Sequence, residues 1–335
     1  MTQTVRTDVA SPDGVIAIRE LDLAAPGFRH LISTEQASRE WIDSNLFPLC
    51  DYLRLRGKYD DLLRGRSVYY LFYEPSFLTR TSFERATELL GGQAYHTEDA
   101  TQFFPIHSVS QIDNILNILA SLRFDLVVLR SSDSGVMQDA EQANALPVIN
   151  GGSADDHPTQ ALADLYTIHR ELGGIDGCTV AVVGRLEHRN VSALLMGLAA
   201  YENVKVLLLP SSGKVSPEIR SYCDGRGVQL IDVDAIDALA EADAVYLNGP
   251  RTVAHAQLLK SRNSLNLRID ESFMSMLRPH CVVMDPMQRS GDFEVEVTDS
   301  RLAFYRQSAN ALTVRMAVLL NMLAVDPGSN GVNGI

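Results

Sequence analysis

The feature that most constrains the fold is a regular alternation of apolar, strand-like runs with helical runs along most of the chain. The strand-like runs stand at residues 67–73, 92–95, 124–129, 147–150, 178–183, 204–209, 228–231, 244–247 and 281–284. Strands connected through helices form right-handed crossovers in a parallel sheet. The sequence therefore predicts an α/β protein with doubly wound parallel sheets, whose ligand lies beyond the carboxyl ends of the strands.

A polar loop at residues 74–84 follows the first long strand and opens a helix. Donor side chains crowd the start of that helix, namely Ser76, Thr79, Arg80, Thr81 and Ser82. A helix N-terminus offers free amides and partial positive charge, so this loop predicts a phosphate or carboxylate site. The alternative is a hydroxyl-rich helix cap that binds no ligand.

Further polar groups follow two other strands of the same half. Arg130 comes directly after the strand at 124–129, and the segment from His157 to Gln160 follows the strand at 147–150. Alone, Arg130 is typical of an ion-pair partner, and His157 before Pro158 is typical of a helix cap. Together with the 74–84 loop they come from three strands to one edge of a sheet, and this convergence favours a binding site.

Composition narrows the class of ligand. The chain has 335 residues, of which 46% are hydrophobic, enough to form the cores of two domains. Its net charge of −13 is unsuited to binding the phosphate backbone of a nucleic acid. Basic clusters are therefore expected to hold small anionic ligands or ion pairs. Four cysteines lack any CxxC spacing and are expected to be reduced core thiols: Cys50, Cys178, Cys223 and Cys281. The N-terminus lacks an apolar signal core and no run is long enough to span a membrane, which predicts a cytoplasmic protein with no membrane partner.

Residues 184–190 follow a strand in the second half and open a helix, as a dinucleotide-binding loop would. Their sequence is not GxGxxG, so an NAD enzyme is a weak alternative.

The motifs resemble the aspartate/ornithine carbamoyltransferase family, over nearly the whole chain. The resemblance rests on Ser76-x-x-Thr-Arg-Thr-Ser-Phe-Glu84, on Arg130 after its strand, and on His157-Pro-Thr-Gln-Ala-Leu-Ala-Asp-Leu165. It continues through Asp285-Pro-Met-Gln-Arg289, Gln307-Ser-Ala-Asn310 and Arg315. The resemblance implies two doubly wound domains, a homotrimer with active sites between subunits, and carbamoyl transfer from carbamoyl phosphate to an amine without metal or organic cofactor.

By match to the family, His157 and Arg130 would hold the carbonyl oxygen and Gln160 the carbamoyl amide, while Ser76 and Thr79 would contact phosphate. The expected organisation is an N-terminal tail at 1–26, a carbamoyl-phosphate-type domain at 27–160 and a second-substrate domain at 161–307. A C-terminal helix at 308–326, returning to the first domain, and a disordered tail at 327–335 complete it.

The chain departs from the family pattern in its phosphate loop. Phe77 and Leu78 stand where the family has Thr and Arg, so the main phosphate cation is missing, and at Arg80's spacing its side chain points elsewhere. A second cation, supplied in the aspartate enzymes by a neighbouring subunit, is also absent: the corresponding segment, 101–107, offers Phe103 and His107.

The acceptor side departs as well. If the alignment with the family contains a one-residue deletion, Arg189 stands at the position of a family arginine. Without that deletion, Asn190 stands there. Gly249 and Arg251 stand at the positions of a family Arg and Gln, and Pro286, Met287 and Arg289 form the loop that follows the strand at 281–284. Arg185, Arg189, Arg251 and Arg289 suggest a carboxylate-bearing ligand, although each alone is equally typical of a surface charge.

Three hypotheses follow. The leading one is a divergent carbamoyltransferase, closer to the aspartate type, that acts on a small carboxylate-bearing amine, because Arg130, His157 and Gln160 are retained. The second is a different reaction on the same fold, lyase or amide chemistry on a ligand without phosphate, because Phe77 and Leu78 are apolar. The third is a non-catalytic paralogue that serves an active homologue as a regulatory or structural subunit.

Overall fold

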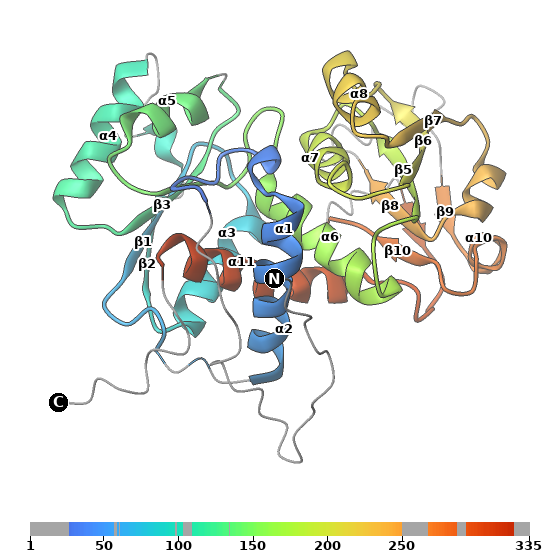
Figure 1. Ribbon diagram of the computed structural model, residues 1–335, viewed down its shortest axis with the longest axis horizontal. Helices are drawn as coiled ribbons and strands as arrows, with labels where there is room; N and C mark the ends of the chain where they lie inside the picture. The colour runs from blue at the N-terminus through green and yellow to red at the C-terminus, as the bar shows by residue number, and fades with distance from the viewer. Residues whose placement is uncertain are drawn as a thin grey trace, which may run out of the picture.

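The computed structural model describes residues 27–56, 59, 61–97, 99–102, 109–133, 135–249, 267–286 and 293–324. Within them, two parallel sheets with helices on both faces stand side by side (Figure 1). The prediction of two doubly wound parallel-sheet domains is confirmed.

The first sheet has the order β2-β1-β3-β4 and is parallel throughout. Its strands are β1 (Ser67–Phe72), β2 (Gln93–Thr97), β3 (Leu126–Arg130) and β4 (Val148–Asn150). The register sets Phe72 opposite Arg130 and Leu129 opposite Asn150, so three strands end at one edge. Their following loops therefore start close together, as the sequence predicts.

Alternate side chains of β1 face two separate cores. Val68, Tyr70 and Phe72 pack in the core that includes α2 (Phe47–Arg56) and α3 (Phe77–Leu89). Leu71 packs in the core that includes α4 (Val109–Ser121) and α5 (Val136–Ala143). Burial on both faces explains why the strand reads as a continuous apolar run.

The second sheet has the order β10-β8-β5-β6-β7 and is also parallel. Its strands are β5 (Thr179–Arg185), β6 (Lys205–Ser212), β7 (Gln229–Asp232), β8 (Ala244–Asn248) and β10 (Val282–Met284). The elements around it are α7 (Arg189–Leu198), α8 (Pro217–Asp224), η5 (Ile236–Glu241), α10 (Glu271–Met276) and the parallel pair β9 (Leu267–Ile269) and β11 (Phe293–Val295).

Two long helices run between the sheets, α6 (Pro158–Leu172) and α11 (Phe304–Met322) (Figure 1). They contact each other, and α11 also contacts α2 and α3, so the predicted return of the C-terminal helix to the first half is confirmed. The remaining elements are η2 (Thr34–Gln36), α1 (Arg39–Trp41), η3 (Ile42–Leu46) and η4 (Ala100–Gln102).

Several boundaries differ from the expected ones. The C-terminal helix α11 spans Phe304–Met322, whereas the sequence predicts 308–326. Helix α6 begins at Pro158, within the range expected for the first domain, because proline at the first helical position sacrifices no hydrogen bond. Residues Ile236–Glu241 form a 3-10 helix. Strands β9 and β11 span three residues each, too few to show a strand period, and the sequence did not predict them.

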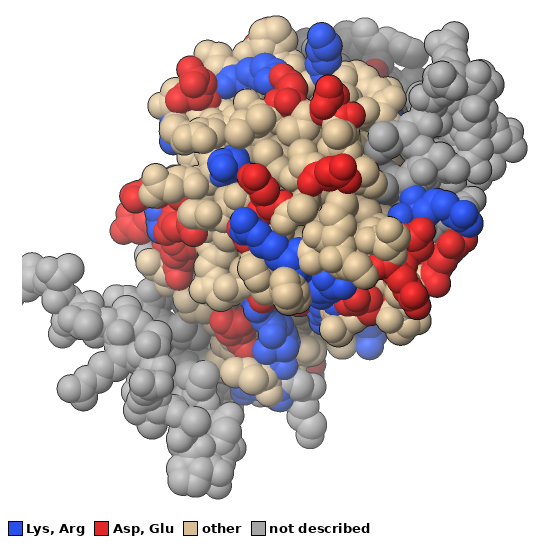
Figure 2. Space-filling model, turned by 90° about the vertical axis from the view of Figure 1, so that its right-hand side faces the viewer, with Lys and Arg blue, Asp and Glu red and all other residues tan. Residues whose placement is uncertain are grey.

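The surface carries both signs of charge. Figure 2 shows the face of the second half, where basic and acidic side chains are interspersed rather than gathered in a basic stripe. All four cysteines are unbridged, and Cys50, Cys223 and Cys281 are buried. Within the described residues, no helix is long and apolar enough to cross a membrane, and no three His, Cys, Asp or Glu side chains converge as metal ligands.

Candidate active site

The start of α3 has the form of an anion site. Ser76 is its N-cap residue, with extended backbone, and among the described residues its side chain makes no capping hydrogen bond. Amides of the first turn have no partner within the helix and suit an anion. Thr79 is buried, and its Oγ1 lies 3.2 Å from Nε2 of His157, which joins this helix to the loop after β4.

The other side chains of this turn differ in exposure and in their contacts. Phe77 is 83% exposed, Thr81 is exposed and Leu78 is partly buried. Arg80 Nε lies 3.8 Å from Glu84 Oε1, one turn along the same helix. Arg80 is therefore held beside an acidic neighbour, in line with the direction expected from its spacing.

Arg130, the last residue of β3, is buried at the same edge. Its Nη1 donates to the carbonyl of Gly151 at 2.9 Å, and its Nη2 lies 3.9 Å from Glu74 Oε2. Gly152 makes room for it: a Cβ there would lie 2.4 Å from Arg130 Nη1, and the backbone φ of +121° is one that glycine tolerates. A glycine of the loop after β4 thus permits the position of the guanidinium.

His157, immediately before α6, is buried and held by its backbone. Its N–H donates to Asp156 Oδ1 at 2.7 Å. Burial, with the positive charges of Arg130, Arg315 and other nearby groups, holds the pKa of His157 well below its usual value. The imidazole is therefore neutral at neutral pH and offers one N–H donor.

Gln160, in the first turn of α6, belongs to a buried chain of hydrogen bonds. Its Nε2 donates to Asp164 Oδ1 at 2.9 Å, and Gln307 Nε2 donates to the same oxygen at 2.7 Å. The backbone N–H of Asp285 donates to Gln307 Oε1 at 2.8 Å. Burial raises the pKa of Asp164 to about 7, against the effect of these bonds. This series of hydrogen bonds connects Gln160 to the loop that contains Pro286, and Pro286 is itself buried.

Arg189, at the start of α7, brings the second half into the site. It is 5% exposed, its Nη2 lies 3.4 Å from Glu74 Oε2, and its Nη1 donates to Ser132 Oγ at 3.3 Å and to the carbonyl of Ser153. Of the two alternatives in this loop, Arg189 is the one with contacts to the first half. Arg185 instead pairs with Glu187 at 3.2 Å.

The expected site residues thus fall into three groups. Those at the shared edge are Ser76, Thr79, Arg130, His157, Gln160 and Arg189. Phe77, Leu78, Arg80 and Thr81 lie in the first turns of α3, where Arg80 lies beside Glu84. Arg251, Met287, Arg289, Phe103 and His107 lie outside the described residues.

Sequence reasoning missed two charged groups. Glu74 was noted only as the start of the loop, although a lone acidic residue at the carboxyl edge of a site rich in arginine indicates an arginine partner. Arg315, matched only by resemblance, is fully buried and donates to Ser82 Oγ at 2.7 Å. Burial lowers the pKa of Arg315 to about 10, so its charge persists beneath the first turns of α3.

Comparison with known sequences identifies the family. The family model of the aspartate/ornithine carbamoyltransferase carbamoyl-P binding domain matches residues 29–170, and that of the Asp/Orn binding domain matches residues 176–322. The chain belongs to the aspartate/ornithine carbamoyltransferase family. The resemblance found in its motifs is confirmed, and relatives of the aspartate type support the assignment to that type.

Among the relatives of this chain, aspartate carbamoyltransferase 1, chloroplastic, of Pisum sativum is 32% identical over 88% of this chain and 78% of the relative. The aspartate carbamoyltransferase catalytic subunit of Methanococcus vannielii is 33% identical over 87% of this chain and 97% of the relative. Aspartate transcarbamoylase from Trypanosoma cruzi, solved with N-(phosphonacetyl)-L-aspartic acid, is 27% identical with a TM-score of 0.80, covering 91% of this chain and 99% of that one.

Proposed function

We propose that this protein transfers a carbamoyl group from carbamoyl phosphate to the amine of a small carboxylate-bearing amino acid, with aspartate as the principal acceptor. The observation that carries the proposal is the meeting of Arg130, His157 and Gln160 at one edge of the first sheet. The names of the relatives, which are aspartate carbamoyltransferases, favour aspartate.

The proposed chemistry needs little more than positioned donors. The neutral amine attacks the carbonyl carbon, a C–N bond forms, the C–O bond to phosphate breaks, and the amine proton leaves with the phosphate. Arg130 and the N–H of neutral His157 would stabilise the developing oxyanion. The Nε2 group of Gln160 donates its hydrogen bond to Asp164. The Oε1 of Gln160 would therefore accept from the carbamoyl NH2 group.

Phosphate would bind at the start of α3, through the first-turn amides, Ser76 and Thr79. Leu78 provides no cation, and Arg80 of the same turn lies beside Glu84. The positive charges of Arg130, Arg189 and Arg315 act on His157, which contacts Thr79 of this helix. A charge-assisted hydrogen bond contributes about 1.5–3 kcal/mol. We therefore expect an affinity for carbamoyl phosphate lower than that of a family member that keeps the arginine.

Arg189 is the proposed contact for an acceptor carboxylate. Arg251, Pro286, Met287 and Arg289 remain predicted contacts on the same side. The division into domains at 27–160 and 161–307, the homotrimer and the cytoplasmic location also remain proposals. Helix α6 would then lie at the start of the second domain and contact both.

The test is an assay of phosphate release from carbamoyl phosphate with a panel of amino acids, with mass spectrometry of the ureido product. We expect turnover with aspartate, and its loss in Arg130→Ala while the fold and assembly persist. No turnover with any acceptor would overturn the proposal and favour a non-catalytic subunit. Product formed without phosphate release would favour a different reaction on this fold.

A further inference from the structure

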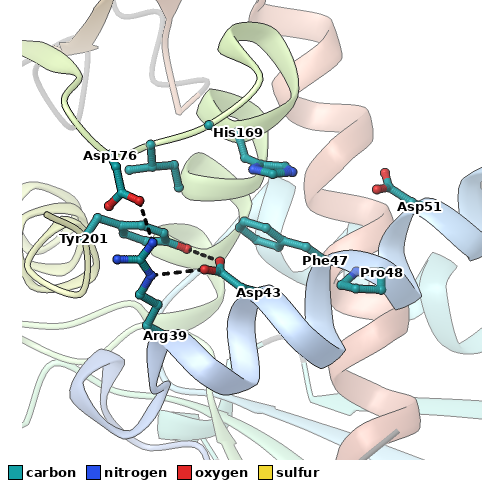
Figure 3. A pocket seen from close by; sticks show the side chains of 10 residues that line it. Arg39, Asp43, Phe47, Pro48, Asp51, His169, Asp176 and Tyr201 are labelled. Atoms are coloured by element: carbon teal, nitrogen blue, oxygen red, sulfur yellow. Dashed lines mark hydrogen bonds and ion pairs between the residues drawn. The ribbon is translucent and has the colours of Figure 1, made fainter. Parts of the chain in front are cut away.

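A pocket of about 240 Å³ is lined by residues from both halves and by none of the active-site residues described above (Figure 3). Its walls come from the helical segment 39–51, from the end of α6 with the loop after it, and from Tyr201 after the end of α7. Drug-sized ligands fill about 300–1,000 Å³, so an occupant of this pocket is a small molecule.

One wall presents an ordered series of side chains. Asp43, Phe47 and Asp51 recur every fourth residue, and Figure 3 shows Phe47 between the two carboxylates, beside His169. The rings of Phe47 and His169 have centroids 4.9 Å apart. This wall therefore has an acidic group at each end and an apolar, aromatic middle.

The charge of the lining favours a cation. Three carboxylates, of Asp43, Asp51 and Asp176, face one guanidinium, that of Arg39. Helix α6 ends at the pocket, and the partial negative charge of a helix C-terminus also favours cations. The series acidic, apolar, acidic is complementary to a molecule with a positive charge at each end of a short hydrocarbon chain.

The existing hydrogen bonds leave one carboxylate without a cation. Arg39 pairs with Asp43 at 3.2 Å and with Asp176, and Tyr201 Oη donates to Asp43 Oδ1 at 2.9 Å. Asp51 Oδ1 accepts from Tyr166 Oη at 2.6 Å. No Lys or Arg of the described residues forms an ion pair with Asp51, so this carboxylate keeps its charge uncompensated beside the pocket.

We propose that this pocket is a binding site for a short linear diamine, with one ammonium at Asp51 and the other at Asp43. Asp43 lies in the π-helical segment η3 and Asp51 in α2, and eight residues separate their backbone positions by roughly 11–12 Å along the axis. Two charge-assisted hydrogen bonds of about 2.8 Å leave roughly 6 Å between the nitrogens, the span of a four-carbon chain. The methylene groups then lie against Phe47 and Pro48.

The pocket and the active site lie at opposite ends of the same two helices. Helix α6 has His157 directly before its start and is roughly 22 Å long, and its last turn contains His169. Helix α7 begins at Arg189, and Tyr201 follows its end. A rotation of one half against the other would move both sites. A diamine that binds more tightly at one angle would therefore favour the form of the active site that belongs to that angle. This consequence rests on the proposed function, whereas the binding site does not.

Isothermal titration calorimetry of the full chain at pH 8 tests the binding directly, with 1,4-diaminobutane as the probe and uncharged 1,4-butanediol as its matched control. We expect saturable binding of the diamine alone. Asp51→Asn keeps the shape and the acceptor for Tyr166, and should weaken binding about 10-fold or more. Asp237→Asn, a change of an exposed aspartate in η5, should bind as the parent chain does.

A second variant tests the location without removing charge. Gly174 lines the pocket, and no atom lies within 4 Å of a Cβ built there, so the backbone at this position accepts a side chain and the added bulk of Gly174→Leu should weaken binding. The proposal would be overturned if Asp51→Asn or Gly174→Leu bound the diamine as tightly as the parent chain does. It would also be overturned if the diol bound as tightly as the diamine, or if the diamine showed no saturable binding. Carbamoyl transfer is measured separately, so its absence would contradict the proposed function and leave the binding result readable.

Discussion

Glu74 Oε2 lies 3.4 Å from Arg189 Nη2, and this ion pair joins the end of β1 in the first half to the start of α7 in the second. Both side chains are largely buried, 17% and 5% exposed, so salt screens the pair less than a surface pair. The same oxygen lies 3.9 Å from Arg130 Nη2. Glu74 thus holds two guanidinium groups beside each other that would otherwise repel.

Glu74→Gln keeps the shape of this side chain and removes its charge. The two arginines then lose their shared partner, and the contact between the halves weakens by about 1.5–3 kcal/mol. We expect kcat/KM for the acceptor to fall about 10- to 100-fold, measured by steady-state kinetics at saturating carbamoyl phosphate.

The matched control for Glu74 is Glu187→Gln. Glu187 pairs with Arg185 at 3.2 Å, but its side chain is 41% exposed and both residues belong to the second half. Its loss should change the rate little, because exposed pairs contribute about 0–1 kcal/mol. A rate unaffected by Glu74→Gln would mean that the ion pair does not contribute to catalysis.

Gly152→Ala tests whether the position of Arg130 matters. The added Cβ would lie 2.4 Å from Arg130 Nη1, and alanine is strained at a φ of +121°. The guanidinium must move, so we expect kcat to fall about 100-fold, as for loss of one oxyanion donor. Gly27→Ala, at a glycine outside both sites, meets no atom within 4 Å and should keep full activity. If Gly152→Ala were fully active, the carbonyl oxygen of carbamoyl phosphate would not bind at Arg130.

The sequence predicted the sheets and the three-strand meeting point, because buried strands leave continuous apolar runs and parallel strands end at one edge. It did not predict the ion pair between Glu74 and Arg189, or that Gln307 donates to Asp164. Arg189 lies 115 residues from Glu74 along the chain, and Gln307 lies 143 residues from Asp164. No local pattern records such a pairing, whereas Arg130, His157 and Gln160 belong to motifs that the chain displays locally.

Leu78→Arg asks whether the start of α3 is a weakened phosphate site. A guanidinium in the first turn adds a charge-assisted hydrogen bond of about 1.5–3 kcal/mol, so affinity for carbamoyl phosphate should rise about 10- to 150-fold. Calorimetry with carbamoyl phosphate and with inorganic phosphate measures it. Leu122→Arg, at a leucine that is 64% exposed, controls for added charge. Unchanged affinity with loss of the native activity would mean that the loop is built for another ligand.

The buried neutral His157 predicts a dependence of stability on pH. Its native pKa lies well below the usual value of about 6.5, which the unfolded chain restores. As the pH falls through 6.5, the unfolded chain therefore binds a proton that the native state excludes. The free energy of unfolding that His157 contributes is present above pH 6.5 and is lost on acidification, by at most about 1.4 kcal/mol per pH unit.

His157→Gln removes this titration and keeps an N–H donor at a similar distance from the backbone. We expect urea denaturation between pH 7.5 and 5.5 to show a smaller loss of stability in the variant than in the parent chain. Burial raises the pKa of Asp164 to about 7, so its own contribution has the opposite sign, but it is present in both proteins and cancels in the comparison. Equal slopes for the two proteins would mean that His157 takes up its proton as readily in the native state as in the unfolded chain, and would remove the argument that its imidazole is a neutral donor.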